Sequence, residues 1–137
     1  MGTRRCTERG SIAVWAAMVI PAFVIIVGLG VDFAGHAAAE QSARAVAAEA
    51  ARAGGQYLHA GPGSRPEPNT SNARQAATAY VEASDLTGTV SLDAGVITVR
   101  VTGRYETLFL GIMGVNELPI HGRGAASVHT VVDGAER

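Results

Sequence analysis

The sequence predicts an α+β protein in which a long N-terminal helix, first transmembrane and then stalk, precedes a small domain of one helix and a three-stranded antiparallel sheet. Residues 11–31 form an uncharged apolar run, residues 32–53 are rich in alanine and lack proline, and apolar and polar residues alternate in the last third of the chain. A charge-free run of this length matches a membrane span, alanine favours helix, and alternation favours strands.

Composition argues against a nucleic-acid-binding protein. The 137 residues carry 11 basic and 12 acidic side chains, so the net charge is −1 and no basic surface for phosphates is expected. The charge is unevenly placed, because the leader, residues 1–10, holds three arginines against one glutamate while the remaining chain is acidic. The lone cysteine, Cys6, lies in this leader and cannot form an internal disulfide.

The apolar run at residues 11–31 is predicted to be a transmembrane helix. A helix of its 21 residues is about 31 Å long, which matches the hydrocarbon core of a bilayer. Eleven of these residues are Ile, Val, Leu or Phe, and together they favour insertion by about 3 to 7 kcal/mol. A buried helix in a soluble core is the alternative, but the sequence offers no second apolar segment of similar length to cover it.

Charges on the two sides of the span predict its orientation. The arginines of the leader precede it, whereas Asp32 and Glu40 follow it. By the positive-inside rule the leader is cytoplasmic, and residues from about 32 onward lie outside the cell membrane. A cleaved secretory signal with a cut near residues 37–39 is the nearest alternative, but its apolar core would be longer than the ~7–15 residues usual for such signals.

The stalk helix over residues 32–53 is expected to end at Gly54-Gly55, since glycine commonly follows a helix end. Glu40 and Arg44 can pair across one helical turn on its polar side. The opposite side carries a helix-packing face of small residues: Ala39, Ala43, Val46, Ala47, Ala50 and Ala53. This face can pack on the chain's own domain or against a neighbouring subunit, and the sequence leaves both open.

The rest of the chain divides into a linker and a small α+β domain outside the membrane. Residues 54–72 are rich in glycine and proline and predict the linker, and residues 73–137 form the domain. A tight hairpin is expected at residues 93–96. The domain's helix is predicted at residues 72–84, and its strands at 89–93, 96–105 and 118–132.

An apolar segment, LFLGIMG at residues 108–114, lies between the last two predicted strands. We expect it to be a short core helix, because a domain this small needs its apolar residues inside. The alternative is an exposed patch that meets the membrane surface or a partner.

No pattern in the sequence indicates catalysis, a metal or a cofactor, so an enzyme is not expected. The sequence lacks a nucleophile elbow, a phosphate-binding loop, CxxC and HExxH. Asp32 and Glu40 are expected to be solvated where the helix leaves the membrane. Four histidines never occur at metal-ligand spacing: His36, His59, His121 and His129.

A family resemblance lies in the order of features along residues 8–56. A charged leader with an Arg-Gly pair is followed by a small apolar run with a central proline, a Gly-rich exit and an Ala-rich helix. This stretch resembles the TadE/TadG-like family of tight-adherence (Flp-type) pilus-assembly proteins, actinobacterial type. The stretch from Gly88 to Val132, with LFLGIMGV before a last strand, is also similar to that family.

The resemblance implies a pilin-like fold and a pseudopilin role. In such proteins a prepilin peptidase cuts the leader after a glycine, which here places the cut between Gly10 and Ser11. The helix then enters a filament or its assembly base through contacts with other pilus-assembly or pilin-like subunits. Type IV-like prepilins carry glutamate at the fifth mature position, where it pairs with the N-terminal amine of a neighbour. This chain has Trp15 there, which cannot form that pair.

We therefore expect a non-catalytic, membrane-anchored component of an Flp-type pilus or related secretion assembly, which acts by helix packing in the membrane within a homo- or hetero-oligomer. The alternative is an exported or membrane-tethered small binding domain, with an uncleaved anchor or a cleaved signal, unrelated to a filament.

Overall fold

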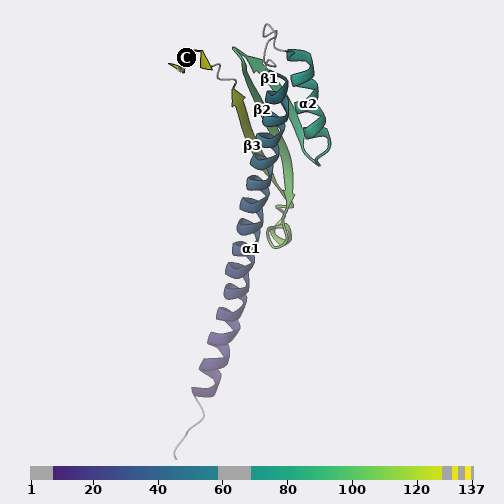
Figure 1. The fold of residues 1–137 in the computed structure, drawn as a ribbon. Helices are drawn as coiled ribbons and strands as arrows, with labels where there is room; N and C mark the ends of the chain where they lie inside the picture. The colour runs from purple at the N-terminus through teal and green to yellow at the C-terminus, as the bar shows by residue number, and fades with distance from the viewer. Residues whose placement is uncertain (1–7, 59–68, 128–130, 133–134, 137) are drawn as a thin grey trace, which may run out of the picture.

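The computed structural model describes residues 8–58, 69–127, 131–132 and 135–136, with side chains described for 11–58 and 69–127. One long helix, α1, carries a small domain along its C-terminal half, while its N-terminal half projects alone (Figure 1). This arrangement confirms the predicted α+β fold of a long apolar helix, a short helix and a three-stranded antiparallel sheet.

α1 spans Glu8–Gly55 as one continuous helix of 48 residues, and a helix of that length is about 72 Å long. Pro21 lies inside it without ending it, and a short 3₁₀ helix, η1, follows at Gln56–Leu58. Between residues 11 and 31 the large apolar side chains are exposed, as at Trp15 and Phe23. This part of α1 is long and apolar enough to cross a membrane, and it is not covered like the core helix of a soluble domain.

The sheet contains β1 (Thr87–Asp93), β2 (Val96–Glu106) and β3 (Glu117–Ser127) in the order β1-β2-β3, with both pairs antiparallel. The predicted hairpin is confirmed, because Asp93 pairs with Val96 and the two residues between them both have positive φ. Such a two-residue turn matches the right-handed twist of the strands that it joins.

Several element boundaries differ by one or two residues from the sequence-based expectation, and the end of the third strand differs by more. The third strand, predicted to continue to residue 132, ends at Ser127; a separate two-stranded ribbon pairs β4 (Val131–Val132) with β5 (Ala135–Glu136). The short helix α2 covers Thr70–Glu82 and so begins two residues earlier than predicted. The Asn69 side chain caps it by accepting a hydrogen bond from the Asn72 amide, which fixes the start.

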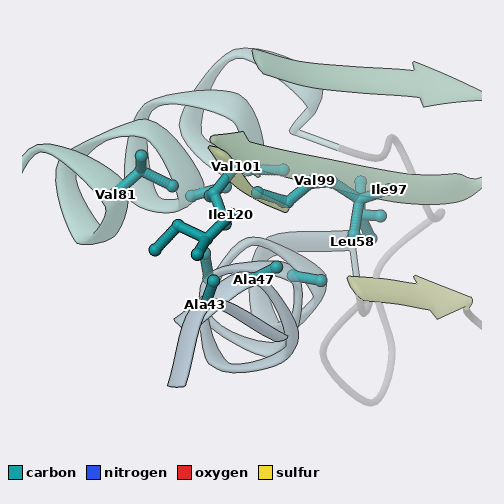
Figure 2. Packing of buried hydrophobic residues seen from close by; sticks show 12 residues of the cluster. Ala43, Ala47, Leu58, Val81, Ile97, Val99, Val101 and Ile120 are labelled. Carbon is teal, nitrogen blue, oxygen red and sulfur yellow. The ribbon is translucent and has the colours of Figure 1, made fainter. Parts of the chain in front are cut away.

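The core lies between the sheet and the two helices. α1 packs on β3 and β2, α2 packs on β1, and the helices also contact each other. Every second side chain of β2, at Ile97, Val99 and Val101, is buried beneath the helices (Figure 2). The rest of the buried cluster comes from both helices, η1 and β3: Ala43, Ala47, Ala50, Ala51, Leu58, Ala73, Ala77, Val81 and Ile120.

β3 approaches α1 so closely that it has room only for glycine. A Cβ built on Gly122 would collide with the Ala43 carbonyl of α1, and one built on Gly124 would collide with the Ala47 carbonyl. Gly54 near the helix end makes a similar approach, where a Cβ would lie 2.7 Å from the Ala73 carbonyl oxygen of α2. Helix and sheet are therefore in backbone-to-backbone contact over about one helical turn.

The small-residue face predicted for the stalk lies largely in this contact. Ala43, Ala47 and Ala50 are fully buried within the single chain, and Ala39 and Val46 pack at the edge of the core. Ala53 is half-buried. The predicted Glu40–Arg44 ion pair is present at 2.7 Å on the exposed side.

Replacing Gly124 with alanine should loosen the domain from α1, because the added methyl group cannot fit against Ala47. We expect a loss of about 1–3 kcal/mol, typical of overpacking, seen as a lower midpoint when the full chain in detergent is melted and followed by near-ultraviolet circular dichroism. Gly30→Ala is the matched control, since a Cβ at Gly30 meets nothing within 4 Å. Equal midpoints for the two variants would contradict this packing.

Candidate functional site

The candidate site is the junction between α1 and the loop that joins β2 to β3. This apolar loop, residues 107–116 (TLFLGIMGVN), contains the short 3₁₀ helix η2 (Leu110–Met113) and carries no charged residue. It lies at the end of the sheet nearest the N-terminal half of α1 (Figure 1). The junction thus lies where the helix passes from its apolar run into the domain.

Asp32 is the centre of the junction. Its side chain is fully buried (0% exposed), and it accepts three backbone hydrogen bonds from consecutive loop amides. Oδ1 accepts from Leu108 N at 2.8 Å, while Oδ2 accepts from Phe109 N at 2.9 Å and from Leu110 N at 2.6 Å. The expectation that Asp32 is solvated is therefore wrong, because the loop folds over it and supplies the donors that water would otherwise provide.

Two opposing effects act on the charge of Asp32, which follows the uncharged run 11–31. Burial raises the pKa of the carboxyl, whereas the amides of Leu110, Leu108 and Phe109 lower it, and the net shift is downward. Hydrogen bonds donated to a carboxylate stabilise its charged form. Asp32 is accordingly a carboxylate at neutral pH, which is the form that accepts all three hydrogen bonds.

Two glycines let the domain touch the same face of α1. Phe109 lies against Gly28, and the Tyr105 hydroxyl lies against Gly35; a Cβ at either glycine would collide with the aromatic ring. His36 donates from Nε2 to the Pro119 carbonyl at 3.0 Å, and its ring meets Tyr105 edge-on with centroids 6.1 Å apart. These contacts come from the loop and from both strands that flank it.

The loop itself is closed by its own hydrogen bonds. The Thr107 amide donates to the Asn116 carbonyl at 3.0 Å, and the Thr107 hydroxyl donates to the Val115 carbonyl. Inside the loop, the amides of Ile112, Gly114 and Val115 donate to the carbonyls of Phe109, Gly111 and Leu110. With the three bonds to Asp32, most backbone donors of the loop have partners within the chain.

The apolar side chains of the loop point outward. Ile112 is 83% exposed, Met113 74% and Leu108 67%, and no residue of η2 is buried. The expectation of a core helix at residues 108–114 is therefore wrong, and the alternative of an exposed apolar patch is correct. The core is filled instead by β2 and by the alanines of both helices, so the loop is not needed there.

The other residues singled out in the sequence are not gathered into a site. Gly10 and Ser11 lie in the first turn of α1, and Trp15 is 67% exposed on its projecting part. His121 is exposed on the outer face of β3. Cys6, His59 and His129 lie outside the described residues. Among the described residues no group of histidines, cysteines and carboxylates could hold a metal ion.

Sequence reasoning missed the role of Asp32, although one signal was present. Gly28, Asp32 and Gly35 follow one another at spacings of four and three, which places them on one face of a helix. Two glycines and a carboxylate on one face predict a close approach with a polar contact. The pattern does not show which distant segment makes that approach.

Removing the carboxylate should release the loop. Asp32→Leu leaves three amides without an acceptor, and each unpaired buried amide costs about 1–3 kcal/mol. We expect amide hydrogen exchange at Leu108, Phe109 and Leu110 to accelerate on the order of tenfold or more in lipid nanodiscs. Asp32→Asn, which keeps one oxygen, should give a smaller acceleration.

Glu40→Gln is the control for this experiment, since the Glu40 carboxylate pairs with Arg44 on the exposed side of the same helix. Its exchange at residues 108–110 should equal that of the native chain. Unchanged exchange in Asp32→Leu would show that the loop is held without the carboxylate.

Comparison with known protein families gives a match to part of the chain. Residues 10–57 match the family of TadE/G-like Flp pilus-assembly proteins, a stretch that covers α1 and η1 almost completely. Comparison with curated proteins and with solved structures finds no match. The matched residues include Gly28, Asp32, Gly35 and His36, so the helix side of the junction lies inside the family region, while its loop side lies outside. The match of residues 10–57 to the TadE/G-like Flp pilus-assembly family agrees with the resemblance found in the sequence.

Proposed function

We propose that this chain is a non-catalytic, pseudopilin-like component of an Flp-type pilus-assembly system, anchored in the cell membrane by the first part of α1. The observation that carries the proposal is the coincidence of the family match, residues 10–57, with the long helix. The matching helix has its small-residue face largely buried against the chain's own domain, and it exposes large apolar side chains around its projecting half.

The proposed topology places the leader in the cytoplasm and the α+β domain outside. Support comes from the arginines of residues 1–10 and from the absence of any charge between Ser11 and Val31. Among the described residues, the buried positions of α1 follow this run, apart from Gly28 beneath the apolar loop. The projecting half of α1 is therefore free to contact lipid or the helices of other pilus-assembly subunits.

Trp15 separates this chain from a filament-forming pilin. A pilin glutamate in the membrane is stabilised by the amine of a neighbouring subunit, and an indole offers no such charge pair. Trp15 lies exposed on the projecting helix, where a large amphipathic ring suits a lipid or protein neighbour. We therefore propose an assembly component rather than the major filament subunit.

The N-terminus of the protein from its native host tests the pseudopilin proposal. Intact mass and N-terminal sequencing, with membrane and sheared-surface fractions kept apart, should give a chain that begins at Ser11. Gly10→Val should block that cut, and Gly30→Ala, a glycine change inside the span, should not. An intact leader in the membrane would overturn processing and leave a permanent anchor. A start near Glu40 would make the chain an exported domain instead.

The lone cysteine tests the topology. In the Gly10→Val variant, which keeps its leader, a membrane-impermeant maleimide added to intact spheroplasts should leave Cys6 unlabelled until the membrane is opened. In a Cys6→Ser background, Glu82→Cys on the exposed surface of α2 should be labelled at once. The reverse pattern would contradict the proposed orientation. In the native chain, a cleaved leader also leaves the protein unlabelled after the membrane is opened. Continued absence of label therefore distinguishes cleavage from shielding of Cys6 by the membrane.

A further inference from the structure

Five large side chains of the apolar loop are exposed together, although most backbone donors of the loop are paired. They are Leu108, Phe109, Ile112, Met113 and Val115. A patch of this kind on a small domain marks a surface that contacts something apolar. The loop has no charged residue among its ten, so no side-chain charge opposes its transfer from water into an apolar medium.

The loop stands beside the membrane-spanning part of α1, not beyond it. Phe109 packs on Gly28. A groove of about 350 Å³ separates loop and helix, lined by Val24, Ile25 and Leu29 on α1 and by Phe109, Ile112 and Met113 on the loop. At ~1.5 Å per residue, Gly28 lies ~5 Å and Val24 ~10 Å inside the outer end of the run 11–31. A bilayer that covers this run therefore reaches the loop.

Most backbone amides of the loop are hydrogen-bonded within the chain, which suits a position at membrane depth. Irregular backbone at membrane depth is tolerated only where its polar groups are satisfied within the protein. Asp32 accepts hydrogen bonds from the three consecutive amides that lead into η2. The amides of Thr107, Ile112, Gly114 and Val115 donate to carbonyls of the loop itself. The carboxylate itself is covered, so its charge is solvated by amides and not exposed to lipid.

We propose that the apolar loop is inserted into the outer leaflet, with lipid acyl chains as the occupant of the groove against α1. Lipid is favoured over a protein partner because the groove lies at the depth of the apolar run and has no charged side chain in its lining. The domain is then held at the membrane by two segments, the spanning part of α1 and the inserted loop. The proposal rests on α1 crossing the membrane, and it does not depend on any role in pilus assembly.

Tryptophan fluorescence tests the insertion, because the native chain has a single tryptophan. The double variant Trp15→Phe/Ile112→Trp moves that reporter to the most exposed position of the loop. In proteoliposomes of phosphatidylcholine brominated near the middle of its acyl chains, the loop tryptophan of this variant should lose most of its emission. Dissolved iodide should leave the emission unchanged. Trp15→Phe/Met113→Trp repeats the measurement if the first variant fails to fold.

Two controls separate failure of the loop proposal from failure of the span. The native Trp15 should be quenched by brominated lipid, which shows that α1 is inserted. Trp15→Phe/Tyr80→Trp places the reporter on the exposed surface of α2, and it should be quenched by iodide alone. With Trp15 quenched by lipid, quenching of the loop tryptophan by iodide would overturn the proposal. Shielding of the loop tryptophan from both quenchers would also overturn it and would point to a protein covering the loop.

Discussion

The backbone contact between β3 and α1 holds the molecule together. Gly122 and Gly124 bring the strand against the carbonyls of Ala43 and Ala47, so that at these two positions no strand side chain separates helix from sheet. A helix whose core-facing residues are mostly alanine buries little apolar area at each position. Only a partner that comes this close gives such a face dense packing, and glycine in the strand provides it.

The side chains at the contact between helix and domain differ in size along α1. Near the domain's centre, alanines of the helix meet glycines of the strand. Nearer the apolar run 11–31 the sizes are reversed, and Phe109 and Tyr105 of the domain pack against Gly28 and Gly35 of the helix. The domain therefore follows α1 down to its apolar part. A uniform stripe of small residues would have allowed the sheet to slip along the helix by a turn.

Asp32 adds the contact that opposes such a slip. It is the one polar side chain buried among the described residues, and its three hydrogen bonds are directional. A shift of α1 by one turn, ~5.4 Å, would break all of them and leave a buried charge without partners. Alanine and glycine thus allow the backbones of helix and strand to approach closely, while the Asp32 carboxylate fixes the position of the domain along the helix axis.

Local sequence patterns predicted the helices and strands but not the tertiary contacts between them. The uncharged run, the alanine-rich stalk, the hairpin at residues 93–96 and the strand alternation each depend on near neighbours, and the structure bears these out. The contact of Asp32 with residues 108–110 spans 76 to 78 positions, and no local periodicity encodes it. The prediction for the apolar loop was wrong for a related reason, because composition alone does not distinguish a core segment from one exposed beside a long apolar helix.

The central claim is that α1 and the domain form one rigid body, in which the domain keeps a fixed position along the helix axis. Spin labels at Ala38→Cys on α1 and Arg100→Cys on the outer face of β2, in a Cys6→Ser background, measure this by double electron–electron resonance; both positions are exposed. The account predicts one narrow distance distribution, the same in detergent and in bilayers. A broad distribution, or one that shifts between the two, would show a domain that moves on its helix and would contradict the account.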